Sequence, residues 1–167
     1  MQVRKYRPSD RLAAVELFRQ LTEAHRVIYH DPTIGSKDPA RTFRAHLRET
    51  RGGGTWVAVH EGRIVGLVGL IPHDGWGEAE PVVTLGGFRR RGVARLLLRR
   101  VTAEARRRRY RMLTIKPVSR NASALRTFHA LGFRTVGHVE LDMRFGGTAK
   151  RFRPVRGPLL AGRQFQS

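Results

Sequence analysis

Apolar residues in the first fifty positions recur with helical spacing. Every third position is apolar over residues 10–24, which predicts an amphipathic helix with Ser9 at its cap. The residues that set this spacing are Leu12, Val15, Phe18 and Leu21. A second helix is expected to open at Asp38-Pro39, with Asp at the cap and Pro in the first helical position, and to end at glycines 52–54. Residues 25–37 are expected to form the loop between the two helices.

The rest of the chain alternates between strand-like and helical patterns. The predicted strands are residues 2–7, 55–59, 64–70, 78–85, 112–116, 133–136 and 139–145. Residues 92–109 and 121–131 have helical periodicity, and residues 72–77 are expected to be a loop. This order predicts an α/β fold with a mixed, mostly antiparallel central sheet of six to seven strands, flanked by about four helices.

Length and composition narrow the class of protein. A chain of 167 residues suits one domain, predicted to span residues 1–146, with a basic tail at 147–167. The absence of cysteine excludes disulfides, thiolate nucleophiles and cysteine zinc sites, and fits a reducing compartment. We expect a cytoplasmic protein, because no apolar run is long enough for a membrane span and the first residues lack the apolar region of a signal peptide.

The formal net charge of +20 is unevenly distributed, with arginines concentrated in residues 89–111 and 144–163. Such a field attracts nucleic acid, phosphorylated ligands or acidic proteins. Arginines that merely cover solvated helix faces give the same composition. Charge alone therefore does not predict nucleic-acid binding.

The segment from Thr84 to Ala94 has the pattern of an anion site. An apolar strand runs into a glycine- and arginine-rich turn, and the turn runs into a helix. The first amides of a helix lack intrahelical acceptors, and the helix dipole adds positive charge there. Gly92 lets the backbone approach an anion, and the small Ala94 keeps the helix close to it. The segment has neither the G-K-[ST] of a Walker loop nor the dinucleotide fingerprint.

Two motifs together resemble the GNAT acetyltransferase superfamily. R-x-x-G-x-A at residues 89–94 is similar to its pyrophosphate motif, and N-x-x-A-x-x-x-F-x-x-L-G-F at residues 121–133 is similar to its later motif. Their spacing and the order of flanking elements are also typical of that family. The resemblance implies an acyltransferase that uses acetyl-CoA as acyl donor and an amine as acceptor.

The resemblance also implies roles for individual residues. The pyrophosphate of CoA should meet the amides that follow Arg89, namely those of Arg90, Arg91, Gly92, Val93, Ala94 and Arg95. The backbone of Val83, Thr84 and Leu85 should pair with the pantetheine arm, and an amide near Leu85 should polarise the thioester carbonyl. Asn121 should meet the arm or the acetyl group, and Phe128 should lie beside the sulfur. Asn121 as a helix cap and Phe128 as a core aromatic are the structural alternatives.

The chain departs from the family pattern at two places. The family's V-x-P before the turn corresponds to Thr84-Leu85-Gly86, so Gly86-Gly87 should make the turn looser. The family's tyrosine, which reprotonates the thiolate, corresponds to Phe128, and a phenyl ring cannot donate a proton. Solvent or another group would then protonate the thiolate. His129 is adjacent in sequence, but it points about 100° away on a helix.

The general base is expected among the carboxylates of the strand before the turn. Glu78 and Glu80 lie two residues apart and so share one face of that strand. Burial could raise the pKa of either one toward neutrality. The alternative is a solvent-facing pair without a catalytic role.

The remaining histidines and acidic residues give weaker predictions about function. His25 and His30 are five residues apart, which does not suit a helical metal pair, so no metal is expected. His73 and Asp74 are expected near the mouth of the cleft. Residues 25–37 and 72–77 should determine the acceptor, which the sequence does not identify.

The sequence thus predicts an N-acetyltransferase in which an amine attacks acetyl-CoA directly in a ternary complex. The alternative is a basic module with the same fold that binds nucleic acid or the ribosome and has weak or no catalysis. A homodimer is compatible with either function.

Overall fold

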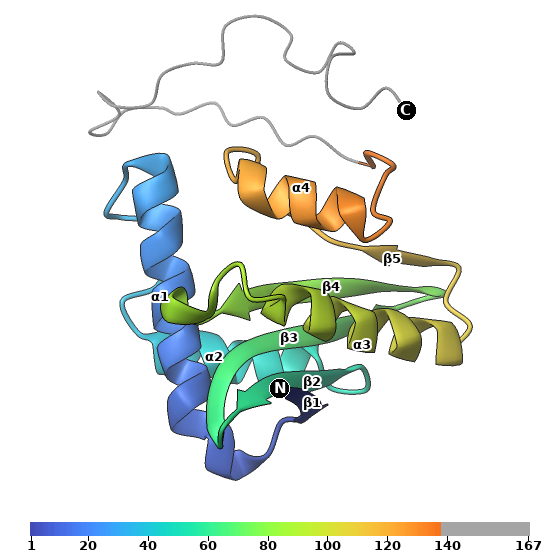
Figure 1. Cartoon of the computed structure of the whole chain (residues 1–167), viewed down its shortest axis with the longest axis horizontal. Coiled ribbons are helices and arrows are strands. Elements are labelled where there is room, and N and C mark those ends of the chain that lie inside the picture. The colour runs from blue at the N-terminus through green and yellow to red at the C-terminus, as the bar shows by residue number, and fades with distance from the viewer. Residues whose placement is uncertain (138–167) are drawn as a thin grey trace, which may run out of the picture.

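The computed structural model describes residues 1–137 (Figure 1). Its elements are β1 (Gln2–Lys5), η1 (Pro8–Asp10), α1 (Arg11–Tyr29), α2 (Pro39–Glu49), β2 (Gly54–His60), β3 (Arg63–His73), β4 (Trp76–Thr84), η2 (Gly86–Phe88), α3 (Val93–Arg107), β5 (Met112–Thr114) and α4 (Ala122–Ala130). The strands form one sheet in the order β1-β2-β3-β4-β5. All neighbouring strands are antiparallel except β4 and β5, which are parallel.

Helices cover both faces of this sheet. His46 of α2 lies against Thr55 of β2, with 3.2 Å between Nε2 and Oγ1. Trp56 follows Thr55 in β2, and its ring centroid lies 5.0 Å from the Arg100 guanidinium of α3. Because adjacent residues of a strand point to opposite faces, α2 and α3 lie on opposite sides of the sheet. Helix α1 packs beside α2, and α4 follows β5 at the edge of the sheet (Figure 1).

The sheet has five strands in the described part of the chain, so the prediction of six to seven was too high. Residues 133–136, predicted as a strand, pair with no other strand there. Phe133 instead packs against Phe128 of α4, with 6.3 Å between ring centroids, and Val136 is largely exposed. The predicted strand at 139–145 and the tail at 147–167 lie outside the described residues.

The predicted first helix is present as α1, but its start and its length differ from the prediction. Ser9 lies inside η1 and is not the cap, and Leu12 is 87% exposed rather than buried. The start is fixed by Asp10, whose carboxylate accepts hydrogen bonds from the amide of Arg7 at 2.8 Å and from the guanidinium of Arg4. Helix α1 continues to Tyr29 and so includes part of the predicted loop.

Two tight turns join β2, β3 and β4, and only the first was expected. Glu61 and Gly62 both have positive φ between β2 and β3, as expected for a tight hairpin turn. Residues 72–77, predicted as a loop, are mostly strand, because Asp74-Gly75 closes a second hairpin between His73 and Trp76. None of the helices within residues 1–137 has the length and apolar character needed to cross a membrane.

Candidate active site

The turn between β4 and α3, residues 86–92, ends in a helix start with free backbone donors. Gly92 precedes α3, and the first amide that bonds back to the turn is that of Leu96, at 3.1 Å from the Gly92 carbonyl. The amides of residues 92–95 therefore have no acceptor in the preceding helical turn. The positive end of the helix dipole lies at the same place, which makes this a site for an anion.

Two glycines shape this helix start for different reasons. Gly92 has a φ of 81°, which only glycine adopts without strain, although a Cβ there would meet nothing within 4 Å. Gly66 of β3 is needed for space, since a Cβ would lie 2.6 Å from Cγ1 of Val93 and 3.0 Å from Cδ1 of Leu97. Gly66 therefore lets the first turns of α3 pack directly against the sheet.

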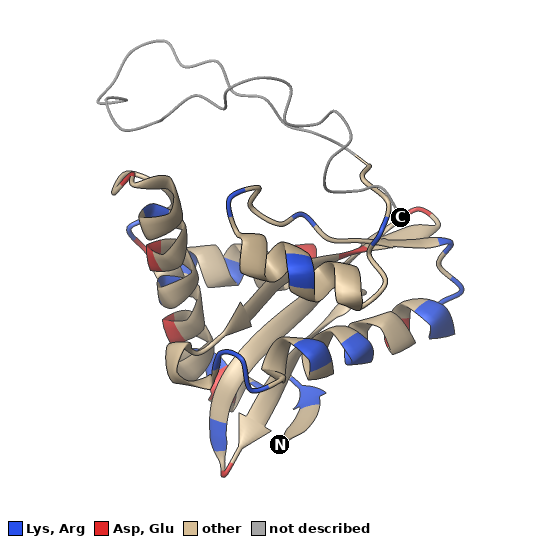
Figure 2. Cartoon of the chain, turned by 45° about the horizontal axis from the view of Figure 1, so that its top comes forward, with Lys and Arg blue, Asp and Glu red and all other residues tan. Residues whose placement is uncertain are grey.

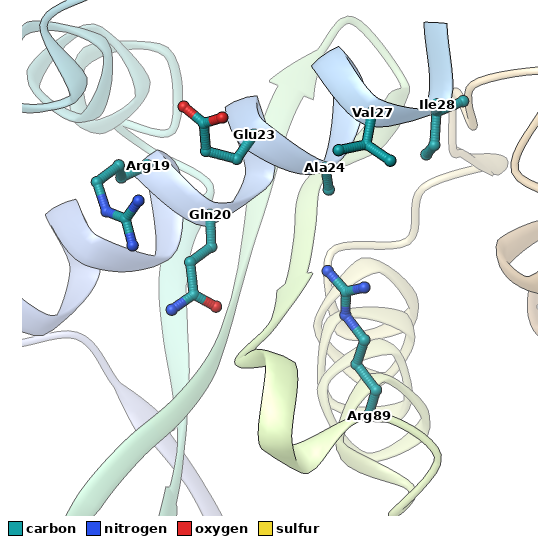
Figure 3. A pocket seen from close by; sticks show the side chains of 7 residues that line it. All are labelled: Arg19, Gln20, Glu23, Ala24, Val27, Ile28 and Arg89. Atoms are coloured by element: carbon teal, nitrogen blue, oxygen red, sulfur yellow. The ribbon is translucent and has the colours of Figure 1, made fainter. Parts of the chain in front are cut away.

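Positive charge surrounds the turn, and no acidic residue lies in the first turn of α3. Figure 2 shows Lys and Arg on this turn and along the outward side of α3. The Arg91 guanidinium lies 5.3 Å from the ring centroid of Phe88, whereas Arg89 points toward α1 (Figure 3). Arg90 has a φ of 61°. Arg89 and Arg91 therefore do not point in one direction, so the feature of this turn best suited to an anion is its row of backbone amides.

One edge of β4 is open beside this turn. Strand β5 pairs with β4 only as far as Glu78 opposite Thr114, so within residues 1–137 no strand covers this edge from Ala79 onward. The amide of Leu85 donates to the Val65 carbonyl of β3 at 2.9 Å. Since successive amides of a strand alternate in direction, the amide of Thr84 points to the open edge. The Leu85 amide, predicted near the thioester, is thus occupied by the sheet.

A β-bulge distorts β4 before this open edge. Ala79 pairs with Leu70 and Val82 with Val68, so that Glu80 and Pro81 together lie opposite the single residue Gly69. A Cβ at Gly69 would overlap the Glu80 carbonyl, so glycine is required for this approach. The bulge lies where β4 leaves β5.

Glu78 and Glu80, the two predicted base candidates, are brought together at this bulge. Glu78 is buried, with 3% of its surface exposed, whereas Glu80 is exposed. Their carboxyl groups are hydrogen-bonded to each other. Two neighbouring carboxylates disfavour each other's ionisation, so the environment decides which of them takes up a proton more readily.

The environment separates the pKa values of the two carboxyls. Although Glu80 as a whole residue is exposed, desolvation of its carboxyl, the hydrogen bond with Glu78 and the negative charge of Glu78 raise its pKa to about 7, and Glu49 contributes in the same direction. Burial would also raise the pKa of Glu78, but its hydrogen bonds with Glu80, Lys116 and His73 and the charge of Lys116 lower the pKa below its ordinary value. The pKa of Glu80 is therefore the higher of the two, and Glu80 takes up a proton more readily than Glu78.

Two further residues surround this pair: Lys116, which the sequence did not predict, and His73, which was expected only near the mouth of the cleft. Lys116 Nζ lies 2.9 Å from the Glu78 carboxylate, and His73 Nε2 lies 3.4 Å from the same group. The His73 ring also stacks on Trp76, with 3.9 Å between ring centroids. Lys116 is 38 residues from Glu78, and only the parallel pairing of β5 with β4 brings them together. The sequence carried no signal for this contact.

The later motif forms α4, and its two singled-out residues have structural partners. Asn121 caps the helix, since its Oδ1 accepts a hydrogen bond from the Ala124 amide at 3.1 Å. Phe128 is 8% exposed and belongs to the hydrophobic core. His129 on the same helix is exposed. The structural alternatives for Asn121 and Phe128 thus hold, and contact with a ligand remains a prediction for both.

A cavity of about 340 Å³ separates α1 from the β4–α3 turn (Figure 3). Its walls are Arg19, Gln20, Glu23, Ala24, Val27, Ile28 and Arg89. His25 belongs to α1, and burial lowers its pKa. No group of three or more His, Cys, Asp or Glu side chains that could hold a metal occurs among residues 1–137.

Solved structures share this fold. A ribosomal-protein-alanine N-acetyltransferase from Brucella melitensis is 22% identical, with a TM-score of 0.69 over 82% of this chain and 86% of that one. A GNAT-family acetyltransferase from Staphylococcus aureus Mu50 is 18% identical, with a TM-score of 0.67 over 84% and 89%. AAC(6')-Iy, solved with the bisubstrate analogue CoA-S-monomethyl-acetylneamine, is 16% identical, with a TM-score of 0.62 over 87% and 98%.

These identities are low enough that the structural likeness shows the fold alone. No curated protein matches the sequence significantly. A family model described as the acetyltransferase (GNAT) family, however, matches residues 14–133, which contain both motifs, the open edge of β4 and the carboxyl pair. The chain therefore belongs to the GNAT family of acetyltransferases.

Proposed function

We propose that this protein transfers the acetyl group of acetyl-CoA to a primary amine by direct attack in a ternary complex. The observation that carries the proposal is the Glu78–Glu80 carboxyl pair, which lies at the β4 bulge where β5 leaves the edge of β4 open. The chain has no cysteine for a covalent intermediate. Catalysis would rest on positioning, carbonyl polarisation and proton transfer.

The amides of residues 92–95 would hold the pyrophosphate of the acyl donor, with Arg89 and its neighbours adding positive charge. The open edge of β4 would pair with the pantetheine arm. Since the Leu85 amide donates to Val65, we assign carbonyl polarisation to an outward-pointing amide such as that of Thr84. Asn121 and Phe128 are proposed to meet the arm from α4.

Glu80 would take the proton from the attacking amine, directly or through water. A base with a pKa near 7 is substantially deprotonated at neutral pH and still accepts a proton readily. Glu78 would remain ionised beside Lys116, and its negative charge would keep the pKa of Glu80 above the ordinary value. Because Phe128 has no acidic hydrogen, solvent would protonate the CoA thiolate.

The test uses the full-length protein with acetyl-CoA and three acceptors: a peptide with N-terminal alanine, neamine and lysine. The first two follow from structural neighbours, a ribosomal-protein-alanine N-acetyltransferase and an enzyme solved with an acetylneamine analogue. Release of CoA thiol that depends on an acceptor supports the proposal. Tight binding of RNA with a steep salt dependence, and no response to acetyl-CoA, would instead favour a nucleic-acid-binding module.

A further inference from the structure

One side chain of α1 reaches the start of the β4–α3 turn. Oε1 of Gln20 accepts a hydrogen bond from the amide of Gly86 at 3.1 Å. The two residues are 66 positions apart in sequence, and Gln20 also lines the cavity beside the turn (Figure 3). The contact therefore joins the helix on one side of the cavity to the segment that leads into the anion site.

The orientation of Gln20 is fixed by a chain of hydrogen bonds along α1. Nε2 of Gln20 donates to Glu16 at 2.9 Å, and Arg19 donates to the same carboxylate through two nitrogens at 2.8 and 2.7 Å. Hydrogen bonds from Arg19 and Gln20 lower the pKa of Glu16 to about 2, so this carboxylate is ionised at neutral pH. With Nε2 bound to Glu16, the amide oxygen of Gln20 is left to face Gly86.

The Gly86 amide is a donor that the turn itself does not use. Gly86 is the first residue of η2, where the amide has no acceptor within the helix, and the preceding Leu85 is extended, with φ −53° and ψ 135°. The turn contains two successive glycines, Gly86 and Gly87. Because glycine is the most flexible residue, ordering this turn costs more conformational entropy than ordering a turn of other residues. A fixed acceptor at the first of them restricts that freedom.

We propose that Gln20 is a positioning residue that orders the β4–α3 turn through the Gly86 amide, and so prepares the amides of residues 92–95 for the phosphates of CoA. This role rests on the proposed use of CoA. The position of Gly86 also suits proline, which favours the first place of a helix after an extended residue. Proline there would order the turn without a donor and make Gln20 unnecessary.

The test compares the full-length wild type with Q20L, G86P and the Q20L/G86P double variant, and with Q2L as a matched Gln-to-Leu control on exposed β1. Calorimetry measures the Kd of CoA. Loss of one hydrogen bond is expected to raise the Kd in Q20L roughly three- to tenfold. We expect Q2L to bind like the wild type, and Q20L to cause no further loss of affinity in the G86P background.

Hydrogen exchange of the unliganded protein gives a reading that does not require CoA. Residues 85–92 should exchange faster in Q20L than in Q2L, with the rest of the chain unchanged. An unchanged Kd and exchange rate in Q20L, or an equal loss of affinity in both backgrounds, would overturn the role of Gln20. Failure of the wild type to bind CoA would instead refute the proposed function, and the exchange data would still decide whether Gln20 orders the turn.

Discussion

Lys116 Nζ lies 2.9 Å from the buried carboxylate of Glu78, at the point where β4 and β5 separate. The lysine thereby keeps Glu78 ionised, and its charge also lowers the pKa of Glu80 against the stronger effects of burial and of Glu78. A residue that follows the neighbouring strand thus lowers the proton affinity of the proposed base.

Replacing Lys116 with Met should move the pH dependence of catalysis. The positive charge that lowers both carboxyl pKa values is lost, so the rise of kcat/KM with pH should shift to higher pH. K116R keeps the charge and should retain the wild-type profile. E78Q removes the negative charge beside Glu80 and should shift the profile to lower pH. A common profile for K116M and E78Q would contradict the assignment.

Glu80→Gln tests the base itself. Removing a positioned general base costs roughly 10²- to 10⁴-fold in rate, so kcat should fall in this range while the Kd of acetyl-CoA stays unchanged. The wild-type rate should rise through a pKa of about 7, and the residual rate of E80Q should lack that step. Full turnover of E80Q across the pH range would place the base elsewhere.

His46 should make stability depend on pH. Burial lowers its pKa from 6.5 to about 4, so the unfolded chain binds the proton more readily and stability falls as the pH drops through this window. The loss should approach about 3 kcal/mol at pH 4. Glu80 has the opposite sign, because its raised pKa favours the folded state toward low pH. Denaturant unfolding of the wild type and H46Q isolates His46, since Glu80 is common to both; equal slopes would contradict the prediction.

The anion site was predictable because its physics is local. A strand, a glycine-rich turn and a helix start are consecutive in sequence, and Gly92 has the positive φ that the turn requires. The hairpin turn at Glu61-Gly62 and the cap at Asp38 were predictable for the same reason. The prediction failed at Leu12 and Ser9, because the Arg4–Asp10 pair sets where α1 begins and which face it buries.

The parts of the site that sequence could not supply depend on long-range contacts. The bulge opposite Gly69 changes the simple alternation of Glu78 and Glu80, and nothing in the sequence of β4 alone places it. Lys116 and Gln20 meet their partners only through the sheet and through the packing of α1. Composition and periodicity contain no information about either pair.

The central claim is that the helix start after Gly92 binds the phosphates of acetyl-CoA. Its most direct test is a calorimetric titration of acetyl-CoA into the full-length wild type, G92A and G62A. Gly62 is the matched control, because it also has a positive φ (75°), with open space around it, but lies in the β2–β3 hairpin. Alanine in this conformation should cost about 1–2 kcal/mol of stability at either site. We predict that only G92A binds acetyl-CoA more weakly, with a Kd roughly tenfold higher for each 1.4 kcal/mol of binding free energy that is lost. Equal affinities of G92A and G62A for acetyl-CoA would contradict the account.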